Sequence, residues 1–131
     1  MIVYCASDLM WATRIRATAE DVGVAARPVR SVDMLRARLA DSPVRCLVLD
    51  PEAPEASLEM LKALRGHNGS PALDPDRRVR VVAFAPHVKT ELMAHAAALG
   101  ADRVLTRGAF DHTLADLLRA EGGATEPNPS M

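Results

Sequence analysis

The sequence has few aromatic residues and few cysteines. Phe, Trp and Tyr together make up 3% of its 131 residues, although apolar residues make up 49%. The core must therefore be built mainly from Ala, Val, Leu, Ile and Met. The two cysteines, Cys5 and Cys46, each lie inside an apolar run, which is typical of reduced, buried thiols. A chain of this length buries about two thirds of its unfolded surface, so one domain can fold without a disulfide or a metal.

The sequence also lacks an excess of charge and a long apolar run. Its 16 basic and 17 acidic residues give a formal net charge of −1. This balance gives no electrostatic reason to expect nucleic acid or an anionic membrane as a partner. No apolar run approaches the roughly 18–20 residues that span a bilayer, and Met1 leads straight into the apolar run 2–5 without a signal peptide. We therefore expect a cytoplasmic protein.

Sequence motifs for common enzyme and cofactor sites are missing. Residues 6–9 read ASDL, without the glycines of a phosphate-binding loop, and no Gly-x-Ser-x-Gly elbow occurs. Asp74 and Asp76 lack the twelve-residue pattern of a Ca²⁺ loop, so we interpret them as a solvated turn. The histidines are spread over separate predicted elements without ligand spacing: His67, His87, His95 and His112. We expect a protein that is not an enzyme and has no cofactor.

Short apolar runs alternate with segments of helical periodicity along the chain. Strands are expected at residues 2–5, 24–29, 46–49, 79–84 and 103–105. Helices are expected at residues 8–22, 56–64 and 90–99, with two more capped by Ser31 and Asp111. Residues 67–77 have no periodicity and predict a surface loop. Residues 121–131 hold two glycines and two prolines and predict a flexible tail after a domain of residues 1–120.

Five such strand–helix units predict an α/β fold with a parallel sheet and helices on both faces. A flavodoxin-like sheet of this kind has the strand order 2-1-3-4-5, with its site where the first and third strands end. Pro28 suits an edge strand there. This rule directs attention to Ala6, Ser7, Asp8 and Asp50. Asp50-Pro51 is also a common turn dipeptide, so position alone leaves a turn and a functional carboxylate both open.

Two segments carry a resemblance to a known family. Residues 47–54 read LVLDPEAP, an apolar strand followed by Asp50 and, four residues later, Pro54. Residues 100–107 read GADRVLTR, a short strand that ends at Arg107. In order and spacing, residues 2–119 resemble the response-regulator receiver domains of two-component signalling. The resemblance implies that Asp50 occupies the phospho-acceptor position and Arg107 the position of the basic residue that contacts the phosphoryl group.

The sequence departs from the receiver pattern around this position. Receivers hold Mg²⁺ with an acidic pair after the first strand, where this chain has Ala6 and Ser7, with Asp8 one place further on. The hydroxyl residue that ends their fourth strand is replaced by Ala85. The aromatic switch residue in their fifth strand is replaced by Val104. The family's Lys is Arg107, whose planar fork does not replace a compact ammonium.

These departures predict little or no phosphorylation at Asp50. Phosphoryl transfer relies on positioning and charge neutralisation, and each lost polar contact costs about 1–3 kcal/mol. We therefore expect a degenerate receiver, or pseudo-receiver, that acts by binding another signalling protein. A homodimer is a further candidate assembly. Two alternatives stay open. One is an atypical but phosphorylatable receiver with a weak Mg²⁺ site at Asp8 and Asp50; the other is a flavodoxin-like domain that binds a small ligand or is an enzyme.

Two surfaces are candidates for partner binding. Met10 and Trp11 are displaced from the apolar face of the first helix, so we expect Trp11 to be partly exposed and available to a partner. The last strand and helix, which form the usual output face of receivers, would present Arg103, Arg107 and His112.

Overall fold

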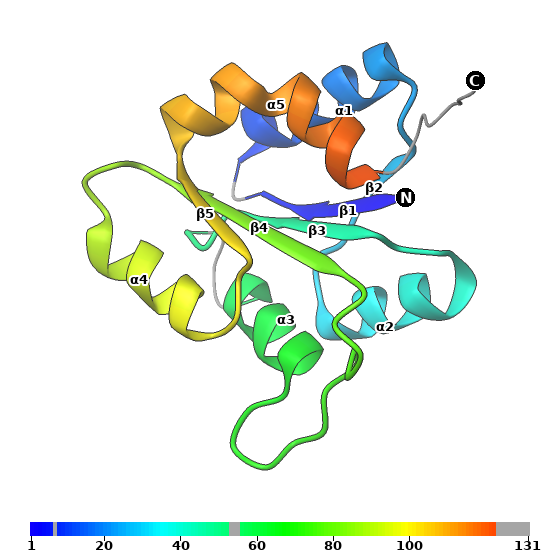
Figure 1. Cartoon of the computed structure of the whole chain (residues 1–131). Coiled ribbons are helices and arrows are strands. Elements are labelled where there is room, and N and C mark those ends of the chain that lie inside the picture. The colour runs from blue at the N-terminus through cyan, green and yellow to red at the C-terminus, as the bar shows by residue number, and fades with distance from the viewer. Residues whose placement is uncertain (7, 53–55, 123–131) are drawn as a thin grey trace.

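The computed structural model describes residues 1–6, 8–52 and 56–122. Strands and helices alternate along the whole of this part of the chain (Figure 1). The elements are β1 (Ile2–Cys5), α1 (Leu9–Val22), β2 (Ala26–Pro28), α2 (Val32–Asp41), β3 (Cys46–Leu49), α3 (Ala56–Arg65), β4 (Arg80–Ala85), α4 (Thr90–Ala98), β5 (Arg103–Thr106) and α5 (Arg107–Gly122). Among these described residues, every helix is too short or too polar to cross a lipid bilayer.

The five strands form one parallel sheet in the order β2-β1-β3-β4-β5, which confirms the predicted topology. Helices α1 and α5 cover one face of the sheet, and α2, α3 and α4 cover the other (Figure 1). The second strand is shorter than expected, because it pairs with β1 only over Ala26–Pro28 rather than over residues 24–29.

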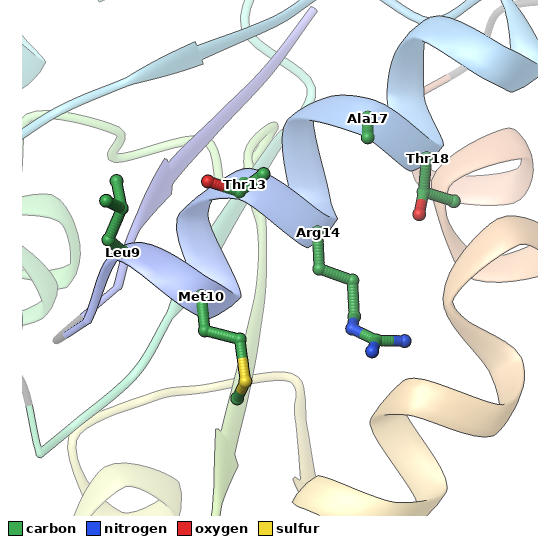
Figure 2. A pocket seen from close by; sticks show the side chains of 6 residues that line it. All are labelled: Leu9, Met10, Thr13, Arg14, Ala17 and Thr18. Atoms are coloured by element: carbon green, nitrogen blue, oxygen red, sulfur yellow. The ribbon is translucent and has the colours of Figure 1, made fainter.

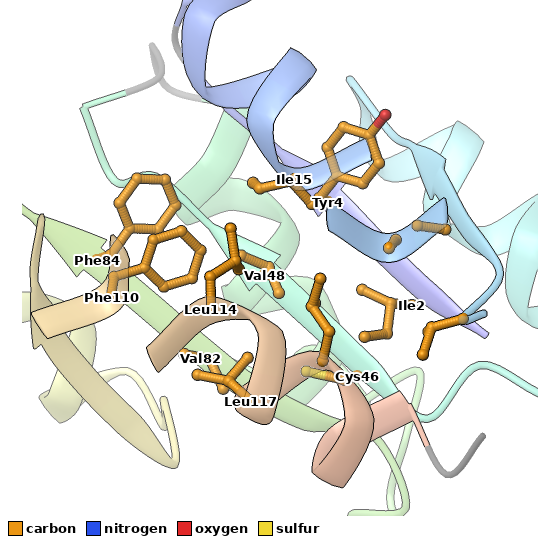
Figure 3. Packing of buried hydrophobic residues seen from close by; sticks show 14 of the residues in the cluster. Ile2, Tyr4, Ile15, Cys46, Val48, Val82, Phe84, Phe110, Leu114 and Leu117 are labelled. Atoms are coloured by element: carbon orange, nitrogen blue, oxygen red, sulfur yellow. The ribbon is translucent and has the colours of Figure 1, made fainter. Parts of the chain in front are cut away.

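The central strand β3 divides the core between the two faces. Successive side chains of a strand point to opposite faces. Cys46 and Val48 therefore pack under α1 and α5 (Figure 3), whereas Leu47 and Leu49 pack under α2, α3 and α4. All four are fully buried, as the unbroken apolar run predicts for a strand covered on both faces.

Three of the four aromatic residues form one cluster on the α1–α5 face. The rings of Phe84 and Phe110 stack with 4.1 Å between centroids and an interplanar angle of 3° (Figure 3). Trp11 lies against both, at 5.1 and 5.7 Å. Only 6% of Trp11 is exposed, so the prediction that it is available to a partner is wrong. In a chain with so few large side chains, the three rings fill the space between α1, α5 and β4.

Asp8 and Ser31 cap the starts of α1 and α2 as predicted, but the start of α5 differs. Asp8 accepts the Trp11 N–H at 2.9 Å and begins α1. α5 begins at Arg107 rather than at Asp111, because Thr106 Oγ1 accepts the Ala109 N–H at 3.1 Å. Asp111 instead pairs with Arg14 of α1 at 2.6 Å. The helix ends at Gly122, so residues 121 and 122 of the predicted tail are helical, and residues 123–131 lie outside the described residues.

At the amino end of the sheet, Arg65 is the centre of a buried network, here called the Arg65 cluster. Its side chain is 4% exposed and donates to the backbone carbonyls of Gly100 at 3.1 Å and Val79 at 2.8 Å. It also donates to the carboxylates of Asp74 at 3.2 Å and Asp102 at 2.7 Å. The arginine thereby ties the end of α3 to the starts of β4 and β5.

Asp74 is a buried member of this cluster, so its interpretation as a solvated turn residue is wrong. Its carboxylate accepts the backbone N–H groups of Arg78 at 2.9 Å and Val79 at 2.8 Å, besides the pair with Arg65. Asp102 accepts the Val81 N–H at 2.8 Å in the same way. The loop between α3 and β4 is therefore held inward by one carboxylate, whereas Asp76 is exposed as expected.

The two cysteines lie at opposite ends of neighbouring strands and are free, as predicted. Cys5 is in register with Leu49, and Cys46 is in register with Ile2. Burial raises the pKa of both thiols; at Cys5 the nearby Asp50 carboxylate raises it further. Both residues therefore hold their protons and act as small apolar side chains.

Candidate functional site

Asp50 lies where β3 ends, at the carboxyl end of the sheet, and is fully buried. Its backbone N–H donates to the Cys5 carbonyl at 2.9 Å, which continues the pairing of β1 with β3. Its Oδ1 accepts the Glu52 N–H at 3.0 Å, closing an Asx-type turn. The sequence left open whether Asp50 is a turn residue or a carboxylate at the site where β1 and β3 end. In the structure it is both.

Arg107 brings a guanidinium to this carboxylate from the first turn of α5. Its Nη2 lies 3.6 Å from Asp50 Oδ2 and 3.2 Å from Glu52 Oε1. The hydrogen bond goes to Glu52, and the contact with Asp50 is the longer one. The structure thus brings Arg107 to Asp50 as the resemblance implies, but it adds a second carboxylate that the sequence reasoning missed.

Glu52 is also approached by a second cation. Lys89, at the start of α4, places its Nζ 3.7 Å from Glu52 Oε2. We call Asp50, Glu52, Lys89 and Arg107 the Glu52 cluster. The position of Glu52 could have been predicted from the sequence, because an Asx turn at Asp50 brings the residue two places later close to it. Lys89 has no such local signal, since only the fold brings its loop to this position.

The Arg107 guanidinium separates the acidic residues from the aromatic cluster. Its Cζ lies 5.9 Å from the centre of the Trp11 ring, within the range of a cation–π interaction. Among the described residues, the buried Nε of Arg107 and the buried Nε1 of Trp11 have no hydrogen-bond partner. Arg107 therefore contacts the acidic residues and the aromatic cluster at once, with one donor not used by either.

The oxygen donors that would hold Mg²⁺ are not assembled here. Ala6 offers no side-chain oxygen, and the Asp8 carboxylate caps α1 through the Trp11 N–H. Asp50 Oδ1 accepts from Glu52, and Oδ2 faces Arg107. Over residues 1–6, 8–52 and 56–122, no three His, Cys, Asp or Glu side chains come close enough to share a metal ion. Asp8 and Asp50, the two carboxylates of the expected weak Mg²⁺ site, thus already make contacts within the chain.

The hydroxyl position at the end of β4 is equally altered. Ala85 is the last residue of that strand and is fully buried, so a methyl group stands where receivers present a hydroxyl. Ser7 and Pro54, two further positions in the comparison with receivers, lie outside the described residues.

A cavity of about 200 Å³ lies beside the site, between β1, β2 and the start of α1. Cys5, Asp8 and Arg30 are among the residues that line it. Ligand pockets for small molecules usually measure about 300–1,000 Å³. The raised pKa of the Cys5 thiol also argues against a nucleophile there. This cavity is therefore smaller than a usual small-molecule site, and its thiol is not activated.

A shallow groove of about 510 Å³ runs along the exposed side of α1 (Figure 2). Met10 and Arg14 project from successive turns, and Arg14 points toward α5, where it pairs with Asp111 (Figure 2). Leu9 and Met10 are 80% and 60% exposed. Of the predicted partner-binding residues, Met10, Arg103 and His112 are exposed, whereas Arg107 is half-buried in the Glu52 cluster.

Solved structures with the same fold include several receiver domains. A response regulator receiver protein from Burkholderia phymatum is 23% identical, with a TM-score of 0.68 over 97% of this chain and 98% of its own. The receiver domain of NtrX from Brucella abortus is 16% identical, with a TM-score of 0.71 over 95% and 100%. This chain has the receiver fold.

A further match is a co-crystal structure from Saccharomyces cerevisiae of the histidine phosphotransfer signalling protein Ypd1 with the receiver domain of Ssk1. That chain is 13% identical, with a TM-score of 0.69 over 92% of this chain and 87% of its own. No family model and no curated protein matches the sequence. The receiver fold is thus carried here by a sequence that keeps Asp50 and a basic residue at 107 while changing their surroundings.

Proposed function

We propose that this domain is a degenerate receiver of two-component signalling, which acts through contacts with another signalling protein and takes little or no phosphate at Asp50. The observation that carries the proposal is the surroundings of Asp50. Its carboxylate is buried between the Glu52 N–H and the Arg107 guanidinium, and the two flanking positions that supply a metal ligand and a hydroxyl in receivers are Ala6 and Ala85.

The chemistry supports this proposal quantitatively. Loss of a metal-bound carboxylate and a hydroxyl donor removes two groups that stabilise the transferred phosphoryl group, at about 1–3 kcal/mol each. Because each 1.36 kcal/mol changes a rate tenfold, the two losses together slow transfer by roughly 30-fold or more. The proposed function accordingly includes no bound Mg²⁺ and no enzymatic step.

Phosphorylation can be tested directly with a small phosphodonor. The protein is incubated with acetyl phosphate and Mg²⁺, beside a conventional receiver as positive control, and intact mass is recorded for the wild type and for Asp50→Asn. We expect an adduct on the conventional receiver and none on either form of this chain. A stoichiometric adduct on the wild type that Asp50→Asn abolishes would contradict the proposal and favour the phosphorylatable alternative.

A restoring variant links the loss to particular residues. Ala6→Asp combined with Ala85→Thr returns one carboxylate and one hydroxyl to the carboxyl end of the sheet. We expect this double variant to form more adduct at Asp50 than the wild type does. An unchanged mass would mean that other features, such as the Arg107–Glu52 contact, block the reaction.

The exposed side of α1 is the proposed contact for the partner protein. Leu9 and Met10 expose apolar surface on this side of α1, and the Ypd1–Ssk1 structure is an instance of a receiver bound to another signalling protein. Leu9→Glu and Met10→Glu should leave the stability of the domain within about 0.5 kcal/mol, because both side chains face solvent. A larger loss in urea unfolding would assign them to the core instead. Sedimentation of both variants beside the wild type shows whether the same surface supports a homodimer.

A further inference from the structure

The Glu52 side chain places a carboxylate between two cations at the carboxyl end of the sheet. Arg107 and Lys89 are the two cations of the Glu52 cluster, and both approach the same carboxylate, at 3.2 and 3.7 Å. The carboxylate belongs to Glu52, two residues after Asp50. The side chains of Glu52 and Arg107 are 28% and 29% exposed, so the pair is partly withdrawn from water.

Three separate segments meet at this one side chain. Glu52 follows β3, Lys89 stands between β4 and α4, and Arg107 is the first residue of α5. An anion held between the two cations therefore fastens the β4–α4 loop and the first turn of α5 to Glu52. A phosphoryl group on Asp50 would face the same Arg107 guanidinium, since Asp50 Oδ2 lies 3.6 Å from its Nη2.

We infer that Arg107 and Lys89 form a binding site for a small oxyanion, and that Glu52 occupies this site from within the chain. This inference rests on the proposed function, because it names what occupies the site in place of phosphate. Glu52 supplies permanently a charge that phosphorylation would supply transiently. The domain is thereby held in one arrangement of these three segments.

Competition between Glu52 and a free anion follows from the geometry. A ligand that needs Arg107 must first displace the Glu52 carboxylate, so its apparent affinity falls by the fraction of molecules in which the site is open. Glu52→Gln keeps the size of the side chain and removes the charge. Inorganic phosphate should then bind to this variant about tenfold more tightly than to the wild type.

The experiment is a titration with sodium phosphate against sodium chloride at equal ionic strength. Binding is read from the nuclear magnetic resonance signal of the Arg107 Nε–Hε group and from the shift in thermal unfolding. We expect a saturable response in both proteins, with the wild type requiring about tenfold more phosphate than Glu52→Gln. Glu52→Gln combined with Arg107→Gln should return the thermal response to flat.

Glu59→Gln is the matched control, since Glu59 pairs with Lys62 on the exposed side of α3 and lies outside the Glu52 cluster. It should behave like the wild type. Equal phosphate binding by the wild type and Glu52→Gln overturns the inference, as does a folded Glu52→Gln that shows no response. If Glu52→Gln fails to fold, Glu52→Ala takes its place in the same titration, and phosphate binding equal to that of the wild type then overturns the inference.

These results are separable from the test of the proposed function. Phosphate binding to Glu52→Gln involves no covalent step, whereas acetyl phosphate reports a covalent adduct on Asp50. An adduct on the wild type contradicts the proposed function whatever phosphate does at Arg107. A flat titration of Glu52→Gln contradicts only the role given to Glu52.

Discussion

Each end of the sheet has an arginine beside two acidic side chains, but the two arginines differ in burial and in hydrogen bonding. At the amino end, Arg65 is 4% exposed and donates to two carboxylates and two backbone carbonyls. At the carboxyl end, Arg107 is 29% exposed and makes one hydrogen bond to Glu52 and one longer contact with Asp50. Both arginines lie between two acidic residues. The buried one is satisfied on all sides and holds the fold together, whereas the half-open one is able to exchange its partner.

Removing Arg65 should have the largest effect on stability. Arg65→Met keeps most of the apolar stem but leaves the buried Asp74 carboxylate without its cation. We expect a loss of about 3–5 kcal/mol in the free energy of unfolding, as for other broken buried ion pairs. Urea unfolding followed by circular dichroism measures it.

Arg36→Met is the control for this change. Arg36 pairs with Asp33 at 3.0 Å on the surface of α2, with both side chains mostly exposed. Its loss should cost no more than about 0.5 kcal/mol. Equal losses in the two variants would remove the distinction between a buried structural arginine and a surface one.

Gly100 supports the Arg65 cluster and should be the next most sensitive position. Its φ is +110°, and an added Cβ would lie 2.8 Å from Arg65 Cγ. Gly100→Ala should therefore destabilise the domain by about 1–3 kcal/mol. Gly69 also has a positive φ, of +84°, but an added Cβ there meets open space among the described residues. If Gly69→Ala costs as much as Gly100→Ala, the contact with Arg65 contributes nothing beyond the backbone conformation.

The buried thiols of Cys5 and Cys46, at opposite ends of the sheet, should make the stability of the fold depend on pH. Burial raises the Cys46 pKa above its ordinary value of 9.0, and Asp50 adds to the same direction at Cys5. Above about pH 9 the unfolded chain releases these protons while the folded chain keeps them, so the stability of the fold falls as pH rises. The slope for one such thiol is at most about 1.4 kcal/mol per pH unit. Urea unfolding across this range should show a shallower fall for Cys46→Ala than for the wild type.

Asp50→Asn tests the carboxyl end in the same experiment. Removing the Asp50 charge should lower the pKa of the Cys5 thiol, measured by thiolate absorbance in a Cys46→Ala background. The pKa of Cys46, measured in a Cys5→Ala background, should not change. A change at Cys46 would mean that Asp50 acts through the fold rather than through its charge.

The Glu52–Arg107 pair should contribute least to stability. A double-mutant cycle with Glu52→Gln and Arg107→Gln is expected to give a coupling energy of about 0.2–1 kcal/mol, because water screens a pair that is partly exposed. Urea unfolding of the four proteins measures it. A coupling as large as the loss in Arg65→Met would make the carboxyl end structural and remove the contrast with the amino end.

Local sequence patterns predicted the parts of the fold that depend on local physics. The apolar run at residues 46–49 predicted a strand buried on both faces, and the Asp8 and Ser31 caps predicted where α1 and α2 begin. The end of α5 was less well defined, since Glu121 has few apolar neighbours in sequence but pairs with Arg80 in the fold. A contact between residues 41 positions apart leaves no periodic signal.

The site was predicted in its position but not in its composition. Strand order placed Asp50 at the carboxyl ends of the first and third strands, and the resemblance to receivers placed Arg107 beside it. The prediction for Trp11 was wrong because helical periodicity considers only the residues of the first helix. Phe84 and Phe110, which bury the Trp11 ring, come from distant segments. Lys89 and Arg65 were missed for the same reason, since their partners come together only in the folded chain.

The single tryptophan gives the molecule an optical reporter of its own. Trp11 is the one indole in the sequence, and the Arg107 and Arg14 guanidinium carbons lie 5.9 and 5.8 Å from its ring. Indole emission is sensitive to a nearby cation. Any movement of Arg107 away from Glu52 is therefore converted into a fluorescence signal without a label, and a binding partner that opens the loops would be visible in the native protein.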